Sequence, residues 1–284
     1  MTAFYLIRPI EDADLPAVID ILCEGFPRRD AAYWRAGLAR LAARQVPEGM
    51  EKYGYIIEDD GPKGVVLAIS SLHAGEGEAP RVFTNISSWC VLSSHRGPAA
   101  KALYQHAARH PEVTSTNLSA AAHTLKTLDR FGFQPWSTGQ TVGIATGRRG
   151  GARVLGPGAA LAAGLDRATH RILADHAAMG CEAFCLETAA GLVPLVFLQR
   201  KVRGWIPAAQ LIYCQDLNAL LAEGRAAWLH LLRRGLPLLI LDASGPLDGI
   251  RGKFYPGRAA KYFRGPRPVH AVDHTYSEMV YLGF

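Results

Sequence analysis

The stretch that most restricts how this chain can fold is residues 82–109, where a strand pattern runs directly into a helix pattern. Its first ten residues, VFTNISSWCV, are rich in β-branched and aromatic side chains, which favour a strand. An Arg-Gly turn follows, and Pro98 then stands in the first turn of a helix, where its missing N–H costs nothing. Free backbone N–H groups at a helix start attract anions, and His95, Arg96 and Lys101 add positive charge nearby. The stretch therefore predicts a site for an anionic ligand held by the backbone.

Length and composition predict a globular protein with a sizeable core. The chain has 284 residues, of which 49% are hydrophobic, and this is comfortable for two domains. It has no run of about 18 apolar residues and no cleavable apolar segment at its start, so we expect no membrane span and a cytoplasmic location. The five cysteines are scattered, which predicts reduced thiols and no metal site.

A glycine- and arginine-rich stretch, GRRGGARVLGPG at 147–158, is the clearest break in the chain. It predicts a first domain at 1–147 and a second at 148–284. Trp89 and Tyr213 are 124 residues apart, as are Val113 and Pro237, so the central strand–helix–strand unit has the same length in both halves. Such internal similarity indicates duplication.

Hydrophobic periodicity and turn residues place the same order of elements in both halves. In the first half we expect strands at 5–10, 53–58, 64–72, 82–91 and 113–119. We expect four helices there: one that starts near Asp14, one at 31–44, one at 98–109, and one that ends at 131–132. In the second half we expect strands at 152–155, 208–214 and 237–242, a hairpin at 182–202, and helices near 161–178 and at 216–234. The predicted class is α/β, with two mixed, mostly antiparallel sheets flanked by helices.

This order, together with three motifs, resembles the GNAT-type acyl-CoA N-acyltransferase superfamily in tandem. The motifs are the start IRPIEDADLPAVIDIL, the 82–109 unit, and LDRFGF ending at Phe133; they span most of residues 5–136, and the second half matches by element order. The resemblance implies an acyl-CoA, such as acetyl-CoA, as co-substrate. Its pantetheine arm would pair with the strand before the turn, and its pyrophosphate would lie on the helix start. The residues implied in cofactor binding are Cys90, Val91, Arg96, Gly97, Ala99, Ala100 and Lys101.

The sequence also departs from the family pattern. The turn pattern Q/R-x-x-G-x-G/A keeps its first residue as Arg96, but Ala99 stands where glycine is usual and Lys101 where a small residue is usual. Leu128 replaces the tyrosine that often serves as general acid. In the second half Asp216 follows the strand, and an aspartate at a helix start satisfies the N–H groups that a phosphate would use. The second half is therefore expected to be a degenerate copy that does not bind coenzyme A in the usual way.

Acyl transfer needs an oxyanion donor, a base for the nucleophile and a proton for the leaving thiolate. Backbone N–H groups around Cys90 and Val91 suit the first role. His123, just beyond the strand at 113–119, is a candidate base, or else a polar surface residue at the start of the next helix. Ser87 and Asn85 share one face of their strand and can orient an acceptor, or are ordinary polar strand positions. Cys90 itself is expected to be a packed thiol rather than a nucleophile.

A cationic segment with interleaved aromatic residues, IRGKFYPGRAAKYFRGPR at 250–267, leaves three interpretations open. It fits a substrate-facing loop, a solvated connector or a nucleic-acid surface. No nucleic-acid-binding motif accompanies it, so a nucleic-acid partner is not expected. The function that the sequence favours is acyl transfer from coenzyme A to an amine or hydroxyl of a small-molecule or polymer acceptor. The alternative is a non-catalytic acyl-CoA-binding protein.

Overall fold

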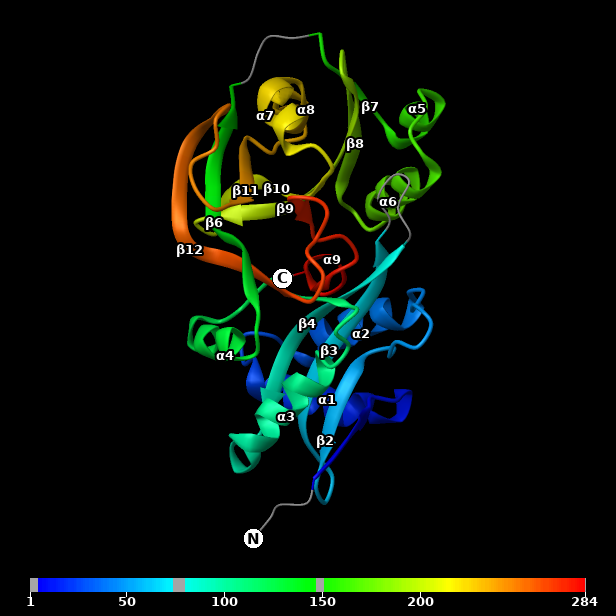
Figure 1. The fold of residues 1–284 in the computed structure, drawn as a ribbon, viewed down its shortest axis with the longest axis vertical. Helices are drawn as coiled ribbons and strands as arrows, with labels where there is room; N and C mark the ends of the chain where they lie inside the picture. Colours follow the sequence, from blue (N-terminus) through cyan, green and yellow to red (C-terminus); the bar gives the residue numbers. More distant parts are fainter. Residues whose placement is uncertain (1–4, 74–79, 147–150, 284) are drawn as a thin grey trace.

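The computed structural model describes residues 5–73, 80–146 and 151–283, and these form one continuous thirteen-stranded sheet with helices on both faces (Figure 1). The first half contains β1 (Leu6–Pro9), α1 (Leu15–Gly25), α2 (Ala31–Ala43), β2 (Gly54–Glu58), β3 (Pro62–His73), β4 (Arg81–Val91), α3 (Pro98–Ala107), β5 (Thr114–Asn117), α4 (Leu125–Arg130) and β6 (Gln134–Ala145). The second half contains β7 (Arg153–Leu155), α5 (Pro157–Ala162), α6 (Arg167–Ala178), β8 (Glu182–Thr188), β9 (Gly191–Val202), β10 (Ile206–Cys214), α7 (Leu217–Glu223), α8 (Arg225–Arg233), β11 (Leu238–Ala243), β12 (Ile250–Arg264), β13 (Val272–Asp273) and α9 (Glu278–Tyr281).

The expected elements are present, with two helices divided. In place of one helix near 161–178 there are two, because α5 begins earlier, at Pro157, and α6 starts at Arg167. They are separated at Gly164, whose φ of +99° is a left-handed conformation that favours glycine. The segment at 216–234 forms α7 and α8, which meet at Gly224. Periodicity alone cannot show such breaks, because the apolar spacing continues across them.

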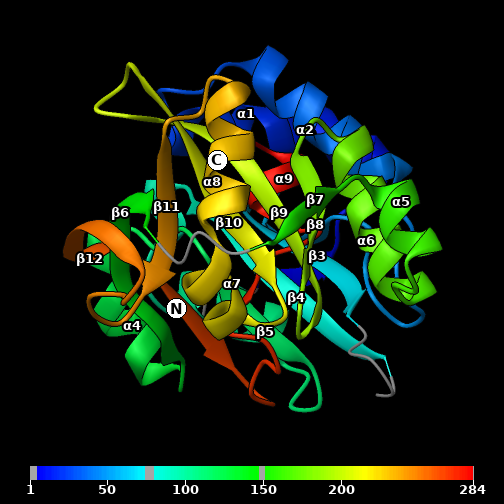
Figure 2. The same cartoon turned by 90° about the horizontal axis from the view of Figure 1, so that it is seen from above.

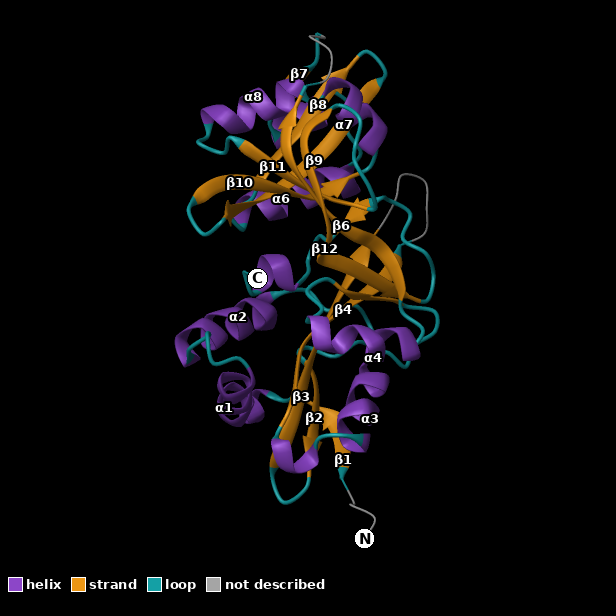
Figure 3. Ribbon diagram, turned by 90° about the vertical axis from the view of Figure 1, so that its left-hand side faces the viewer, coloured by secondary structure: helices purple, strands orange, loops and turns teal. Residues whose placement is uncertain are grey.

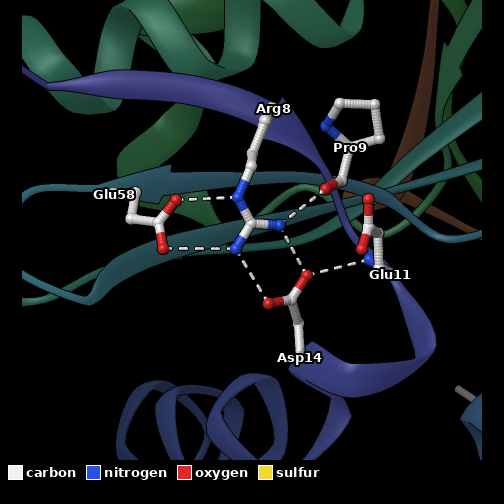
Figure 4. A network of polar contacts seen from close by, with 5 residues as sticks. All are labelled: Arg8, Pro9, Glu11, Asp14 and Glu58. Carbon is white, nitrogen blue, oxygen red and sulfur yellow. Dashed lines mark hydrogen bonds and ion pairs between the residues drawn. The ribbon is translucent and has the colours of Figure 1, made fainter.

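The IRPIEDAD start of the chain is held by an ion-pair network around Arg8 (Figure 4). Arg8 on β1 donates to Glu58 at the end of β2 and to Asp14 at the start of α1, with shortest distances of 2.7 and 2.6 Å. Asp14 also accepts from the backbone N–H of Glu11 at 2.9 Å. Glu58 thereby ties the β2–β3 hairpin to β1.

Two helical layers enclose the sheet of the first half (Figure 3). On one face α1 and α2 bury residues such as Leu22 and Trp34 against β2 and β3. On the other face α3 and α4 bury Leu103 and Leu128 against Tyr55, Ile86 and their neighbours. Because consecutive strand residues alternate between these two cores, β2 and β3 are apolar almost throughout.

The second half repeats this arrangement. α5 and α6 pack on one face of β8–β10, where Leu173 contacts the core around Ile212. α7 and α8 pack on the opposite face, where Leu231 joins the core around Leu195 and Leu211. Seen from above, α7 and α8 run along the strands β9–β11, and α5 and α6 lie beside β7 and β8 (Figure 2).

The two halves exchange their last strands. The strand order is β1-β2-β3-β4-β5-β12-β6-β11-β10-β9-β8-β7, so β12 lies between β5 and β6, and β6 lies between β12 and β11. Each strand of the first half has a counterpart in the second half, from β1 and β7 to β6 and β12. When counterparts are treated as equivalent, the strand order is the same from both ends of the sheet. β6 and β12 run side by side as a long antiparallel pair (Figure 1).

This exchange corrects two expectations. The halves share a single sheet, where two had been predicted, because each half completes the other. The cationic segment at 250–267 is neither a loop nor a connector for most of its length, since residues 250–264 form β12. The division between 147 and 148 stays a prediction, and residues 147–150 lie outside the described part of the chain.

Candidate active site

The first half opens a gap in its sheet where β4 and β5 diverge. The parallel pairing between these strands covers only Phe83–Asn85 of β4, although β4 continues to Val91. A β-bulge lies within the unpaired part, because Ser88 and Trp89 together oppose one residue of β3. Ser88 has a φ of +50°, which marks the strain of this bulge. Beyond Asn85, β4 therefore presents backbone groups to a gap that no other described strand fills.

The helix that follows this gap starts without a side-chain cap. Gly97 is the N-cap of α3, and its φ of +102° requires a residue without a Cβ. The first intrahelical bond in this turn is donated by Lys101 to the carbonyl of Gly97, so the amides of Ala99 and Ala100 precede the ladder. Among the described residues no side chain caps them, and this leaves a helix start that can receive an anion.

Some of the charged side chains predicted near the cofactor lie exposed at this helix start, and others are engaged elsewhere. Lys101 and Arg96 are exposed, and the Arg96 Nε donates to the carbonyl of Val91 at 3.3 Å. His95 is engaged elsewhere, because its Nε2 lies 2.8 Å from a carboxylate oxygen of Asp59. Cys90 points into the core beside α1, and burial raises the pKa of its thiol, which agrees with a packed, unreactive cysteine.

In the second half the equivalent gap is filled by the chain itself. The pairing of β10 with β11 stops at Gln210, and β13 then pairs with β10 at Tyr213 and Cys214. The following amide, of His274, donates to the carbonyl of Ile212 at 2.7 Å. The start of α7 is closed as predicted, since the Asp216 side chain accepts from the amide of Ala219 at 2.9 Å.

From the second-half gap the C-terminal segment, residues 270–283, continues into the first half (Figure 1). Tyr276 is held on the way, because its amide donates to His176 and its hydroxyl donates to Asp175. Burial lowers the pKa of His176 to about 4, so its ring stays neutral and can accept this bond. The segment ends under α2, where Arg40 donates to the carbonyl of Tyr281 at 2.6 Å.

The C-terminal segment brings a carboxylate to the β4 bulge. The Ser87 hydroxyl donates to Glu278, and the backbone amide of Glu278 donates to the Asn85 side chain at 2.8 Å. Ser87 also lies within 3.1 Å of the Ser88 hydroxyl. Glu278 is fully buried, and this burial raises its pKa, although the hydrogen bond from Ser87 opposes the rise. Sequence reasoning found Ser87 and Asn85 but missed Glu278, which no local motif marks.

A small cavity adjoins this cluster and is lined by residues from both halves. Its walls include Asn85 and Thr116 of the diverging strands and residues Asp273–Ser277 of the C-terminal segment. Two buried His–Asp pairs flank it. His73 Nδ1 lies 2.6 Å from Asp273, and His274 Nε2 lies 3.0 Å from Asp242.

Both aspartates of these pairs are ionised in the folded protein. Burial opposes ionisation of Asp273, but the charge and hydrogen bond of His73 outweigh it and lower its pKa to about 2. Burial likewise opposes ionisation of Asp242, whose pKa is lowered by Lys261 and His274. Lys261 is itself buried and donates to the carbonyl of Leu118. The junction between the halves is therefore polar and highly charged.

His123, the base suggested by the sequence, lies apart from this cluster in the contacts that the structure records. It belongs to a 3₁₀ turn, Ala122–Thr124, and is exposed. Within the described residues no group hydrogen-bonds its ring. Leu128, which replaces the family's tyrosine, is buried in the core beneath α4. In the described residues no recorded hydrogen bond joins His123 to the polar groups at the bulge, and its role as base stays a prediction.

No family model and no curated protein matches the chain, whereas solved structures do match it over nearly its full length. Eis1 from Mycobacterium abscessus superposes with a TM-score of 0.51 at 15% identity, over 92% of this chain and 73% of that one. A GCN5-related N-acetyltransferase from Anabaena variabilis superposes with a TM-score of 0.54 at 14% identity, over 92% and 72%. A protein of Pyrococcus horikoshii matches with a TM-score of 0.50 at 12% identity, over 97% and 94%. The chain thus has the fold of the GNAT-type acyltransferases, and its two halves repeat the same order of strands.

Proposed function

We propose that the first half binds an acyl-CoA, acetyl-CoA in the simplest case, and transfers its acyl group to an amine or hydroxyl. The contrast between the two halves supports this proposal. Both contain the same strand, gap and helix start, but in the second half the gap holds β13 and the helix is capped by Asp216. In the first half both positions are left open. An open gap in the first half and a filled gap in the second are expected if only the first half binds a ligand.

The pantetheine arm would pair with the edge of β4 beyond Asn85, and the pyrophosphate would lie on the amides of Ala99 and Ala100. The exposed Arg96 and Lys101 would add charge-assisted contacts. In this arrangement the thioester would lie near the bulge, where amides around Cys90 and Val91 would donate to the oxyanion of a tetrahedral intermediate.

Glu278 is the proposed general base, acting through the Ser87 hydroxyl. The acceptor N–H or O–H loses its proton to Ser87, which passes its own proton to Glu278, while the acceptor attacks the thioester carbon. The carbon–sulfur bond then breaks and coenzyme A leaves as thiolate. Its thiol is acidic enough that this thiolate can leave without a protein acid and take its proton from water. Burial suits Glu278 for this role, since a raised pKa makes a carboxylate a stronger base.

Binding can be tested by thermal unfolding of the protein with and without coenzyme A. A ligand at a hundred times its Kd stabilises by about 2.7 kcal/mol, which corresponds to roughly 5 °C for a chain of this size. We expect Arg96→Glu to abolish this shift, and the matched reversal Arg233→Glu, on an exposed residue of α8, to retain it. Equal shifts in both variants would refute the assigned phosphate site.

Turnover separates a transferase from a binding protein. Release of free thiol from acetyl-CoA, measured across a panel of amines and alcohols, supports transfer. If coenzyme A binds but no acceptor leads to thiol release, the alternative of a non-catalytic acyl-CoA-binding protein is favoured.

A further inference from the structure

The end of β3 contains a hydrogen-bonded serine, histidine and aspartate that the proposed transfer does not use. The Ser71 hydroxyl lies 2.9 Å from His73 Nε2, and His73 Nδ1 lies 2.6 Å from Asp273. Ser71 and His73 are two residues apart and so share one face of the strand. The aspartate arrives from the C-terminal segment, 200 residues further along the chain.

The contacts of His73 set the roles of its two ring nitrogens. An ionised carboxylate only accepts hydrogen bonds, so the Nδ1 of His73 donates to Asp273. In the neutral form of the ring, Nε2 is then an acceptor that faces the Ser71 hydroxyl. This is the arrangement in which a histidine can remove a proton from a serine.

The histidine is also rigidly oriented. Its ring stacks on Phe83 with centroids 4.1 Å apart, and both His73 and Asp273 are buried, with 8% and 6% of their surface exposed. The second oxygen of Asp273 accepts from the hydroxyl and the amide of Thr275. Ser71 is half-buried, so the hydroxyl of the trio remains accessible.

An oxyanion donor is available next to the serine. Pairing of β2 with β3 ends at Leu67, and the amide of Ala68 makes the last contact on that side, to the carbonyl of Tyr53. Strand amides alternate in direction, so the amide of Leu72 points to the same, now open, edge. The Leu72 side chain is 55% exposed there. The amide of the residue after the nucleophile is a common oxyanion donor in serine hydrolases.

We propose that Ser71, His73 and Asp273 form a serine acyl-transfer centre that hydrolyses small activated acyl esters or thioesters without coenzyme A binding. All three residues line the small cavity between the halves, whose volume of about 10 Å³ has room for little more than a water molecule. The acyl group would therefore have to reach Ser71 from the partly exposed side of this residue. The activity is separate from the transfer proposed above, since it needs neither the helix start of α3 nor Glu278.

The steps balance without any further reactant besides water. The Ser71 oxygen attacks the carbonyl carbon while its proton passes to His73 Nε2. The bond to the leaving alcohol or thiol breaks, and Nε2 returns the proton to that group. Water then attacks the acyl-serine, giving its proton to Nε2, and the carboxylic acid leaves as Ser71 regains the proton.

A fluorophosphonate probe tests the centre directly on the full chain, with no coenzyme A present. We expect one phosphonyl group per chain, mapped by mass spectrometry to Ser71, and none in Ser71→Ala. The matched control is Ser70→Ala, because Ser70 is the neighbouring hydroxyl on the opposite face and bonds Thr84 at 2.9 Å. This control should label like the wild type, and Asp273→Asn should label at least tenfold more slowly.

Hydrolysis of p-nitrophenyl acetate gives a second readout, expected to fall at least a hundredfold in Ser71→Ala and to be unchanged in Ser70→Ala and Arg233→Glu. Absence of labelling, labelling of another residue, or unchanged hydrolysis in Ser71→Ala would overturn the proposal. The comparison of Ser71→Ala with Ser70→Ala decides the question even if Asp273→Asn fails to fold. Because neither assay contains coenzyme A, failure of the transferase proposal would leave this result intact.

Discussion

Replacement of Asp273 by asparagine tests how much the junction between the halves depends on one buried charge. Asparagine has nearly the same shape but cannot be ionised. The folded protein lowers the pKa of Asp273 from its ordinary 3.8 to about 2. At about 1.4 kcal/mol per pKa unit, the ionised form therefore contributes about 2 kcal/mol to folding at neutral pH. We expect Asp273→Asn to lower the free energy of unfolding at pH 7 by that amount.

The pH dependence follows from the direction of the shift. A carboxylate whose pKa is lowered on folding stabilises the protein above its unfolded pKa, and that stability is lost as the pH falls through the folded pKa. The difference between wild type and variant should thus be full above about pH 5 and shrink progressively towards pH 2.

Urea unfolding followed by tryptophan fluorescence at pH 7, 5, 4 and 3 measures this difference. The matched control is Asp248→Asn, at an exposed aspartate between β11 and β12, which should change stability by less than about 0.5 kcal/mol. The reasoning is refuted if Asp273→Asn is as stable as the wild type at pH 7, or if its deficit persists unchanged in acid.

Four further changes have definite expected outcomes. Glu278→Gln should lower kcat by about 10²–10⁴-fold with little change in coenzyme A affinity, and an unaltered kcat in a steady-state assay would remove it as the base. Arg8→Ala should lower the melting temperature more at pH 7 than at pH 3, because Arg8 lowers the pKa values of Asp14 and Glu58, and the stability this contributes is lost progressively as the pH falls below their unfolded pKa values and through the folded ones. Gly143→Ala should destabilise by about 1–3 kcal/mol, because its Cβ would lie 2.5 Å from a carbonyl oxygen of β12, and calorimetry can compare it with Gly245→Ala, which has open space. Asp216→Ala should cost about 1 kcal/mol in urea unfolding, and a coenzyme A titration should show no new site because β13 still fills the gap.

Features that depend on neighbouring residues could be predicted from the sequence. The strand–turn–helix unit at 82–109 and the Asp216 cap follow from local signals, and the structure confirms them. The GNAT-type fold followed from the order of such units. Ser87 and Asn85 were assigned to one strand face by alternation, and both meet Glu278 there.

Features that depend on distant pairing could not be predicted. The segment at 250–267 has glycine and proline within a strand, and its strand character arises from pairing with β6, more than a hundred residues away. Glu278 lies 191 residues from Ser87, and Asp273 lies 200 residues from His73, so no sequence spacing marks these contacts. The duplicated spacing was visible in the sequence, but the exchange of strands was not.

The exchanged strands have a consequence for the order in which the protein is made. When residues 134–145 leave the ribosome, β12, the strand that must lie between them and β5, has not yet been translated. The amino-terminal half must wait, with an incomplete sheet edge, until residues 250–264 emerge. Its candidate cofactor gap therefore reaches its final form only after those residues are translated, and a nascent chain released before that point would present an exposed β-edge on which chaperones or aggregation can act.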